Sequence, residues 1–96
     1  MRIIWTEKSE KQLGRIFEYI ADDSIPYAHR TVGQIIEKAE KIPPNPLKDR
    51  VVPEYEHDYI REVFHHPYRI IYLIKDDVIE ILSVIHEARL LPDKST

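Results

Sequence analysis

The stretch that decides the fold is YRIIYLIKDDVIEILSVI, residues 68–85. Residues 68–74 and 78–85 are two runs rich in β-branched and aromatic side chains, which favour strands. Residues 75–77, Lys-Asp-Asp, separate the runs by the length of a hairpin turn. The stretch therefore predicts two neighbouring antiparallel strands.

The first run is largely apolar on both of its faces. Side chains alternate along a strand, so one face carries Tyr68, Ile70, Tyr72 and Ile74, and the other carries Arg69, Ile71 and Leu73. A central strand covered on both sides explains this pattern. Alternatively, the face of Tyr68, Ile70 and Tyr72 is a binding surface for a partner protein.

Further strands and two helices are predicted before the hairpin. Residues 2–5 form a short apolar run, residues 59–64 mix apolar and charged side chains, and Val51 with Val52 begins another short strand. Between these strands, apolar residues recur at helical spacing on two faces. They are Leu13, Ile16, Phe17 and Ile20 in the first helix, and Ala28, Val32, Ile35, Ile36 and Ala39 in the second.

Capping residues mark where both helices begin. Thr6 or Ser9 is placed to cap the first helix, and Ser9 has Gln12 three residues later, as a capping box requires. Ser24 is placed to cap the second helix, and Pro26 suits its first turn.

The predicted order is β-α-α-β-β-β. We expect an α+β fold with a helical hairpin packed on one face of a small antiparallel sheet. Ninety-six residues fit one domain, so residues 1–96 are predicted to form a single unit. The tail, residues 88–96, contains Pro92 and a polar end, and we expect it to be mobile unless a partner orders it.

Composition excludes several classes of function. The chain has no cysteine, which excludes disulfides and thiolate zinc sites, and two glycines, which are too few for a glycine-rich phosphate loop. Its formal net charge of −3 argues against a generally basic nucleic-acid binder. No apolar run approaches the roughly 20 residues of a membrane span, and the N-terminus lacks an apolar signal region. We expect a cytoplasmic protein that contacts no membrane.

Histidines raise the question of a metal site. His65 and His66 are adjacent, and neighbouring side chains at a strand end point to opposite sides of the sheet. His57 lies apart from them in the sequence, and the chain has no HExxH spacing. The sequence therefore predicts neither a metal nor a cofactor.

A series of short motifs, in this order and spacing, resembles one known family. The motifs are Ile4-Trp5-Thr6, Val51-Val52-Pro53-Glu54, Ile60-Arg61-Glu62-Val63, Tyr68-Arg69-Ile70-Ile71-Tyr72 and Val84-Ile85-His86-Glu87-Ala88-Arg89. They resemble the RelE/ParE superfamily of bacterial toxins from type II toxin–antitoxin pairs, and the ParE branch most closely. One departure is Asp49 before Arg50, where ParE-like sequences usually have glycine; a positive φ there would be strained.

The resemblance implies a βααβββ fold and a toxin neutralised by an antitoxin encoded beside it. ParE-like members inhibit DNA gyrase, and we expect this chain to do the same without being an enzyme. RelE-like members are ribosome-dependent mRNA endonucleases, which is the alternative. A third possibility is a non-toxic member that still binds its antitoxin.

The resemblance also marks candidate site residues. Glu54, Arg69 and His86 match the acid, arginine and histidine of some RNA-cleaving members, and a base, a cation and an acid are what cleavage through the 2′-OH needs. The alternative interpretation is structural: Glu54 and Arg69 form an ion pair with Arg61 and Glu62 that holds strands together, and His86 is an ordinary hydrogen-bonded residue.

Polar residues outside that trio complete the candidates. Arg50, Arg61, Glu62, Arg69 and Arg89 are expected to serve the polar framework or to contact the target. Tyr68, Ile70 and Tyr72 are the candidates for antitoxin binding. The RNA-cleaving members usually add a basic cluster or a C-terminal tyrosine that stacks on a base, and no tyrosine follows Tyr72 here.

Overall fold

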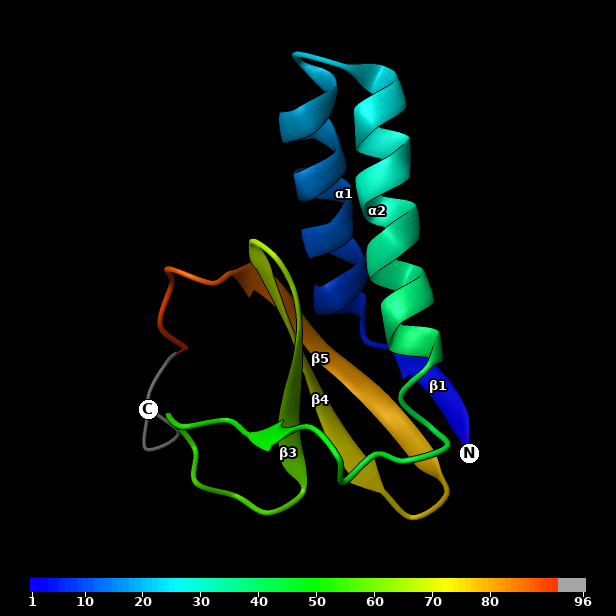
Figure 1. Cartoon of the computed structure of the whole chain (residues 1–96), viewed down its shortest axis with the longest axis vertical. Coiled ribbons are helices and arrows are strands. Elements are labelled where there is room, and N and C mark those ends of the chain that lie inside the picture. Colours follow the sequence, from blue (N-terminus) through cyan, green and yellow to red (C-terminus); the bar gives the residue numbers. More distant parts are fainter. Residues whose placement is uncertain (92–96) are drawn as a thin grey trace.

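The computed structural model describes residues 1–91, and the predicted mobile tail lies partly outside this range, at residues 92–96. The α+β fold is confirmed: two helices pack on one sheet (Figure 1). The elements are β1 (Arg2–Trp5), α1 (Glu7–Ala21), α2 (Ile25–Glu40), β2 (Arg50–Val51), β3 (Ile60–His65), β4 (Tyr68–Lys75) and β5 (Val78–His86). Among the described residues, no helix is long and apolar enough to cross a membrane.

The sheet is mixed rather than purely antiparallel. Its strand order is β1-β5-β4-β3-β2. The three later pairs are antiparallel, as predicted, but β1 runs parallel to β5, with Ile3 opposite Ile79. The two helices between β1 and β2 carry the chain across one face, which lets the first strand enter beside the last. The short β2 overlaps the strand start predicted at Val51 and Val52, and it is a fifth strand beside the four of the predicted order.

Side-chain caps fix where each helix begins. Of the two candidates, Thr6 caps α1: its hydroxyl oxygen accepts a hydrogen bond from the Ser9 N–H at 3.1 Å. The Ser24 hydroxyl oxygen accepts from the Tyr27 N–H at 3.2 Å at the start of α2. Each cap satisfies one of the backbone donors that a helix start leaves unpaired.

A one-residue irregularity interrupts the pairing of β4 with β5. Tyr72 pairs with Ile81, but Ile71 pairs with Ser83, so Leu82 is an extra residue in β5. The start of α1 binds this bulge. The Thr6 hydroxyl donates to the Ile81 carbonyl oxygen at 2.9 Å, and the Gln12 side-chain oxygen accepts from the Val84 N–H at 2.8 Å. Gln12 therefore serves the bulge rather than a capping box.

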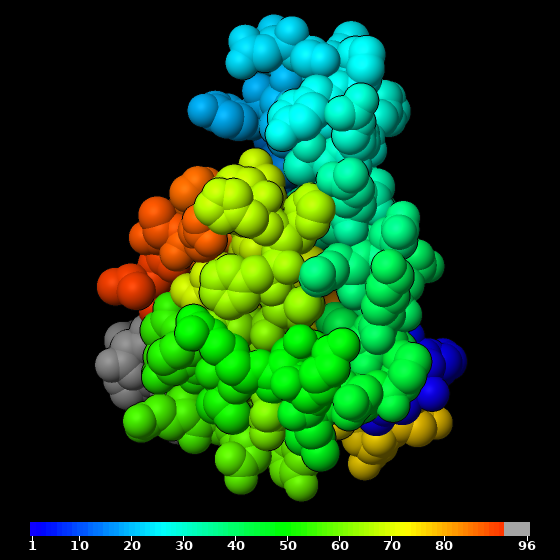
Figure 2. All heavy atoms as spheres, in the orientation of Figure 1, coloured from blue at the N-terminus to red at the C-terminus, as the bar shows by residue number. Residues whose placement is uncertain are grey.

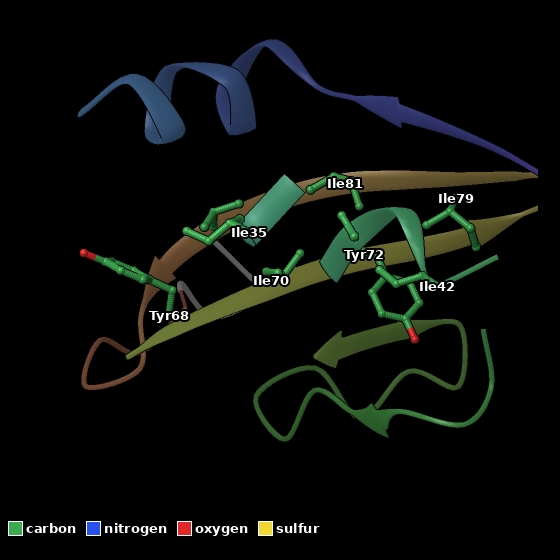
Figure 3. Close-up of a cluster of buried hydrophobic side chains, with 9 residues drawn as sticks. Ile35, Ile42, Tyr68, Ile70, Tyr72, Ile79 and Ile81 are labelled. Carbon is green, nitrogen blue, oxygen red and sulfur yellow. The ribbon is translucent and has the colours of Figure 1, made fainter. Parts of the chain in front are cut away.

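Hydrophobic side chains cover the sheet on both faces. On the helix side, Ile70 and Tyr72 are fully buried against residues of α2 (Figure 3). The members of this cluster are Ile35, Ala39, Ile42, Tyr68, Ile70, Tyr72, Ile79, Ile81 and Val84. The opposite face carries a smaller cluster of Val52, Ile71, Ile85 and Leu91. The doubly apolar pattern of β4 is thus that of a central strand.

The helical hairpin projects beyond the sheet. α1 and α2 stand side by side, and the turn that joins them lies well past the end of the strands (Figure 1). The space-filling view shows the surface hollowed between this hairpin end, in blue and cyan, and the yellow-green and orange parts below it (Figure 2). Tyr19 and Tyr27 are exposed near this end of the hairpin.

We expect Gly33→Ala to stabilise the fold. Gly33 lies within α2, its φ is not positive, and an added Cβ would meet nothing within 4 Å. Alanine is favoured over glycine inside a helix by about 1 kcal/mol. Urea denaturation should show a gain of about 0.5–1 kcal/mol in the free energy of unfolding. Gly14→Ala in α1, equally open, is the independent second site; a loss of stability in both variants would contradict the expectation.

Candidate functional site

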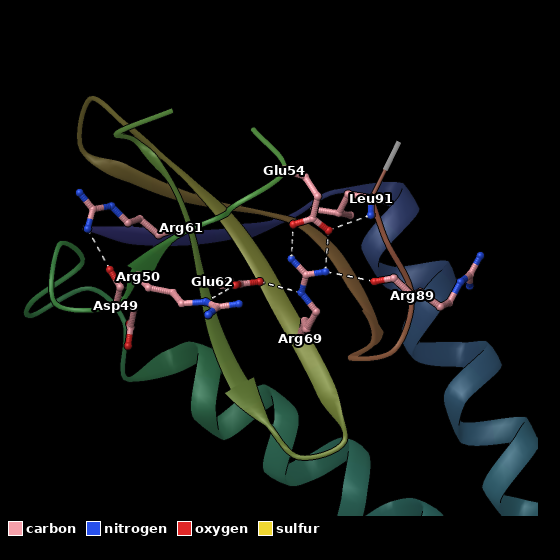
Figure 4. Close-up of polar contacts among 8 residues, drawn as sticks. All are labelled: Asp49, Arg50, Glu54, Arg61, Glu62, Arg69, Arg89 and Leu91. Carbon is pink, nitrogen blue, oxygen red and sulfur yellow. Dashed lines mark hydrogen bonds and ion pairs between the residues drawn. The ribbon is translucent and has the colours of Figure 1, made fainter. Parts of the chain in front are cut away.

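Among the described residues, the buried charged side chains, Glu62 and Arg69, belong to one network of ion pairs. The Arg69 side chain points to the face opposite the helices, and the residue is 4% exposed. Its Nη1 and Nη2 donate to the two carboxylate oxygens of Glu54 at 2.8 and 2.9 Å, and its Nε donates to Glu62 at 2.7 Å (Figure 4). A planar guanidinium is suited to such bidentate pairing. We call Arg50, Glu54, Glu62 and Arg69 the Arg69 network.

Strand pairing brings these residues together. Glu62 of β3 lies opposite Arg50 of β2, and the two side chains form an ion pair. Glu62 is 1% exposed, and each of its carboxylate oxygens accepts a hydrogen bond, one from Arg50 and one from Arg69. The Arg50 guanidinium also lies over the Phe64 ring, 5.2 Å from its centre. The network is neutral in sum, which is how buried charges are tolerated.

Glu54 connects the network to the end of the described chain. Its Oε2 accepts a hydrogen bond from the Leu91 N–H at 3.0 Å, and Nη1 of Arg69 donates to the Arg89 carbonyl oxygen at 3.1 Å. Glu54 raises the pKa of Arg69 above its ordinary value. In return, the Arg69 hydrogen bonds hold the pKa of Glu54 at about 2. A carboxylate with so low a pKa is a poor proton acceptor.

Arg61 has a different role from the one predicted. It does not join the ion pairs of Glu54, Glu62 and Arg69. Its guanidinium donates instead to three backbone carbonyl oxygens: Asp58 at 2.7 Å, Leu47 at 3.2 Å and Asp49 at 2.9 Å. Arg61 therefore fastens the loop before β2 to the start of β3.

The same loop explains how the chain accommodates Asp49. Within residues 1–91, the non-glycine residues with positive φ are Glu56 and Asp76, so Asp49 does not adopt the strained conformation. The Tyr72 hydroxyl donates to the Pro46 carbonyl oxygen at 2.6 Å and lies 3.1 Å from Oδ2 of Asp49. Burial, followed by the Asp49 carboxylate, raises the pKa of Tyr72.

The predicted nuclease trio is not brought together. The pairing of β4 with β5 puts His86 opposite Tyr68, on the helix side, whereas Arg69 lies opposite Ile85 on the other face. Regular alternation of β5 would have placed His86 on the face of Arg69, and the extra residue Leu82 reverses it. His86 is exposed, and its Nδ1 accepts a hydrogen bond from the Ala88 N–H at 3.1 Å.

The three residues predicted to bind an antitoxin are core residues. Ile70 and Tyr72 are fully buried beneath α2 and reach no surface. This corrects the assignment of Ile70 and Tyr72 to a partner surface, because the helices cover the face on which they lie. Tyr68 is 9% exposed and is the one of the three at a surface hollow.

A groove beside Tyr68 was not found by sequence analysis. It has a volume of about 450 Å³ and lies between α1, the end of β5 and the residues that follow β5. Its lining residues are Gln12, Arg15, Ile16, Tyr19, Tyr68, Val84, Ile85, His86 and Arg89. Along the part of the chain that the structure describes, neither Arg15 nor Arg89 forms an ion pair. We call this surface the helix-side groove.

A second hollow continues the groove beneath the hairpin end. It shares Tyr19 and Tyr68 with the groove, and Tyr27 and His65 also line it. Its volume is about 490 Å³. Exposed tyrosines beside apolar side chains are typical of protein-binding surfaces. The sequence feature that could have indicated the helix-side groove is the spacing of Arg15 and Tyr19, which are four residues apart and so share one face of α1.

The histidines do not form a metal site in the described part of the chain. Among residues 1–91, no group of three or more histidine, aspartate or glutamate side chains is arranged to hold an ion. His66 pairs with Glu87 at 2.9 Å, and His57 accepts a hydrogen bond from the Tyr59 N–H at 3.1 Å.

Comparison with known families identifies the group to which this chain belongs. The family described as the ParE toxin of the type II toxin-antitoxin system, parDE, matches residues 3–91. The chain belongs to the ParE toxin family. The predicted resemblance to the RelE/ParE superfamily is thereby confirmed. A comparison of this ParE-family sequence with curated proteins gives no significant match.

Solved structures share the fold of this ParE-family chain. One, described as the chromosomal ParDE TA system from P. aeruginosa, is 21% identical, with a TM-score of 0.75; the match covers 90% of this chain and 95% of that chain. Another, described as the YoeB dimer from Staphylococcus aureus, is 16% identical, with a TM-score of 0.58, and the match covers 86% and 92%. At these identities the likeness is one of fold.

We expect acid to weaken the fold through Glu54. Its folded pKa of about 2 lies below the ordinary value of 4.5. The stabilisation is therefore complete above about pH 4.5 and is lost as the pH falls toward 2. The loss attributable to Glu54 is about 3 kcal/mol.

Urea unfolding of the wild type and of Glu54→Gln between pH 7 and pH 2.5 measures this loss. The variant should be less stable at pH 7, and the two curves should converge as Glu54 becomes protonated. A stability difference that does not change with pH would contradict the expectation.

Proposed function

We propose that this ParE-family chain is a cytoplasmic toxin that binds and inhibits DNA gyrase and is held inactive by a cognate antitoxin. The observation that favours binding over RNA cleavage is the division of the nuclease candidates between the two faces of the sheet. His86 lies opposite Tyr68 on the helix side, whereas Arg69 lies opposite Ile85 on the other face, which disfavours joint action of the two side chains on one phosphate. Cleavage of mRNA on the ribosome remains the competing outcome of the test.

The bonding of Arg69 supports the same proposal. Four of its N–H···O contacts are made within the chain, to Glu54, Glu62 and the Arg89 carbonyl oxygen. A phosphate would have to displace Glu54 to reach the guanidinium. Arg50, which pairs with Glu62, and Arg89, whose guanidinium is free of ion pairs in the described structure, are the more accessible cations for a target.

We assign antitoxin binding to the helix-side groove. Ile16, Tyr19 and Tyr68 offer apolar area, and the Arg15 and Arg89 guanidinium groups lack acidic partners within residues 1–91. An amphipathic antitoxin segment with acidic side chains would complement both features. Because Arg89 is also a candidate target contact, a segment in the groove would cover it and so neutralise the toxin.

His86→Ala separates the two target classes. We expect the purified toxin to block supercoiling by gyrase and to leave mRNA intact in a translating extract mapped by primer extension. The variant should inhibit supercoiling within about twofold of wild type, because the contacts of the His86 side chain within residues 1–91 are a hydrogen bond from the nearby Ala88 N–H and an edge contact with the Tyr68 ring. Codon-positioned mRNA cuts that disappear in the variant, with gyrase unaffected, would overturn the proposal. Absence of growth arrest on induction would indicate a non-toxic member.

Arg15→Glu tests the groove. We expect at least a tenfold weaker affinity for the product of the neighbouring antitoxin gene, measured by calorimetry, because an attraction becomes a repulsion. Inhibition of gyrase by the free toxin should not change. Arg30→Glu is the matched control, since Arg30 is an exposed arginine of the helical hairpin that does not line the groove. Equal affinities for both variants would contradict the assignment.

A further inference from the structure

Residues 88–91 connect the two faces of the molecule. We call them the C-terminal segment. The preceding His86 lies on the helix side, and the Arg89 side chain lines the helix-side groove. Two residues later, Leu91 is 8% exposed and packs against Val52, Ile71 and Ile85 on the other face. Between them, Leu90 is 84% exposed.

Within residues 1–91, the C-terminal segment does not pair with a strand, and two side chains of the Arg69 network hold it in place instead. Arg69 donates to the carbonyl oxygen of Arg89, and Glu54 accepts from the N–H of Leu91. These two backbone groups lie on either side of Leu90. The Arg69 and Glu54 side chains thereby supply the hydrogen bonds that a neighbouring strand would otherwise give.

The neighbours of Glu54 and Arg69 keep them in place for this role. Arg69 is fixed by Glu62 on its Nε side, and Glu54 is fixed by the bidentate pair. Both side chains are mostly buried, at 5% and 17% exposure. Contacts outside the C-terminal segment therefore hold both side chains, and they offer the segment a pair of fixed anchor points.

We propose that Glu54 and Arg69 are positioning residues that clamp the C-terminal segment and fix the direction in which Arg89 and Leu90 are presented. A cationic and an apolar side chain on a fixed backbone can bind a partner with a smaller ordering cost than a loose tail. The clamp itself depends only on the fold. Its use in presenting a target contact rests on the proposed function.

Limited proteolysis with trypsin tests the clamp, because the Arg89–Leu90 bond lies between the two anchored groups. Cleavage after Arg89 requires the segment to leave its position. In Glu54→Ala, cleavage after Arg89 should be at least tenfold faster than in the wild type. The rate is measured from the appearance of the fragment 1–89 by mass spectrometry. Glu87→Gln is the matched control: Glu87 is a carboxylate of the same region that pairs with His66 instead, and the rate should stay within twofold.

Two further readouts separate the clamp from general destabilisation. Cleavage after Arg30, within α2, should accelerate much less than cleavage after Arg89 in the same digest. Arg69→Lys keeps the charge but cannot make the bidentate pair, so it should release the segment as Glu54→Ala does. If the variants do not fold, amide exchange of Leu91 in the wild type decides: an exchange rate equal to that of exposed amides overturns the clamp, and slow exchange supports it.

A gyrase assay tests what the clamp is used for. Glu54→Ala should need at least tenfold more protein than wild type for half-inhibition of supercoiling. Equal inhibition with accelerated cleavage after Arg89 would overturn the presentation of a target contact. If the wild-type chain does not inhibit gyrase, the proposed function fails, whereas the clamp is still decided by the proteolysis, so the two failures are distinguishable.

Discussion

A buried guanidinium constrains one whole face of this molecule. Arg69 is buried near the start of β4, the central strand of the sheet, where its N–H groups cannot be left without acceptors because an unpaired buried charge is strongly destabilising. The acceptors come from three separate parts of the chain: Glu62 from β3, Glu54 from the loop after β2, and the Arg89 carbonyl group after β5. Satisfying one side chain therefore fixes the neighbouring strand, a loop and the C-terminal segment together.

The two faces of the sheet consequently have different tasks. On the Arg69 face, the charges of the Arg69 network pair with one another, which suits a structural role. On the helix side, the overhanging hairpin leaves the helix-side groove, whose Arg15 and Arg89 guanidinium groups have no carboxylate partner among the described residues. Arg89 belongs to both regions, through its carbonyl group on one side and its guanidinium on the other.

Much of the architecture could be predicted from local sequence. The β-branched runs identified β4 and β5, the apolar spacing identified both helices, and Ser24 marked the start of α2. The pairing of Glu54 with Arg69 could also be predicted as a structural ion pair. Its other partners could not: Arg61 was expected in the network, but it alternates with Glu62 along β3 and so lies on the opposite face, where it binds loop carbonyl groups whose position only the tertiary structure shows.

The sequence by itself determined the two helices and the four longer strands in their order, the superfamily, and the doubly apolar strand that had to be central. Only the tertiary structure decided the parallel pairing of β1 with β5, the burial of Ile70 and Tyr72 under α2, and the face on which His86 lies. The last depends on one extra residue, Leu82, in β5. Periodicity read from the chain assumes regular alternation, whereas a bulge is held by partners distant in sequence, here Thr6, which caps α1, and Gln12 within α1.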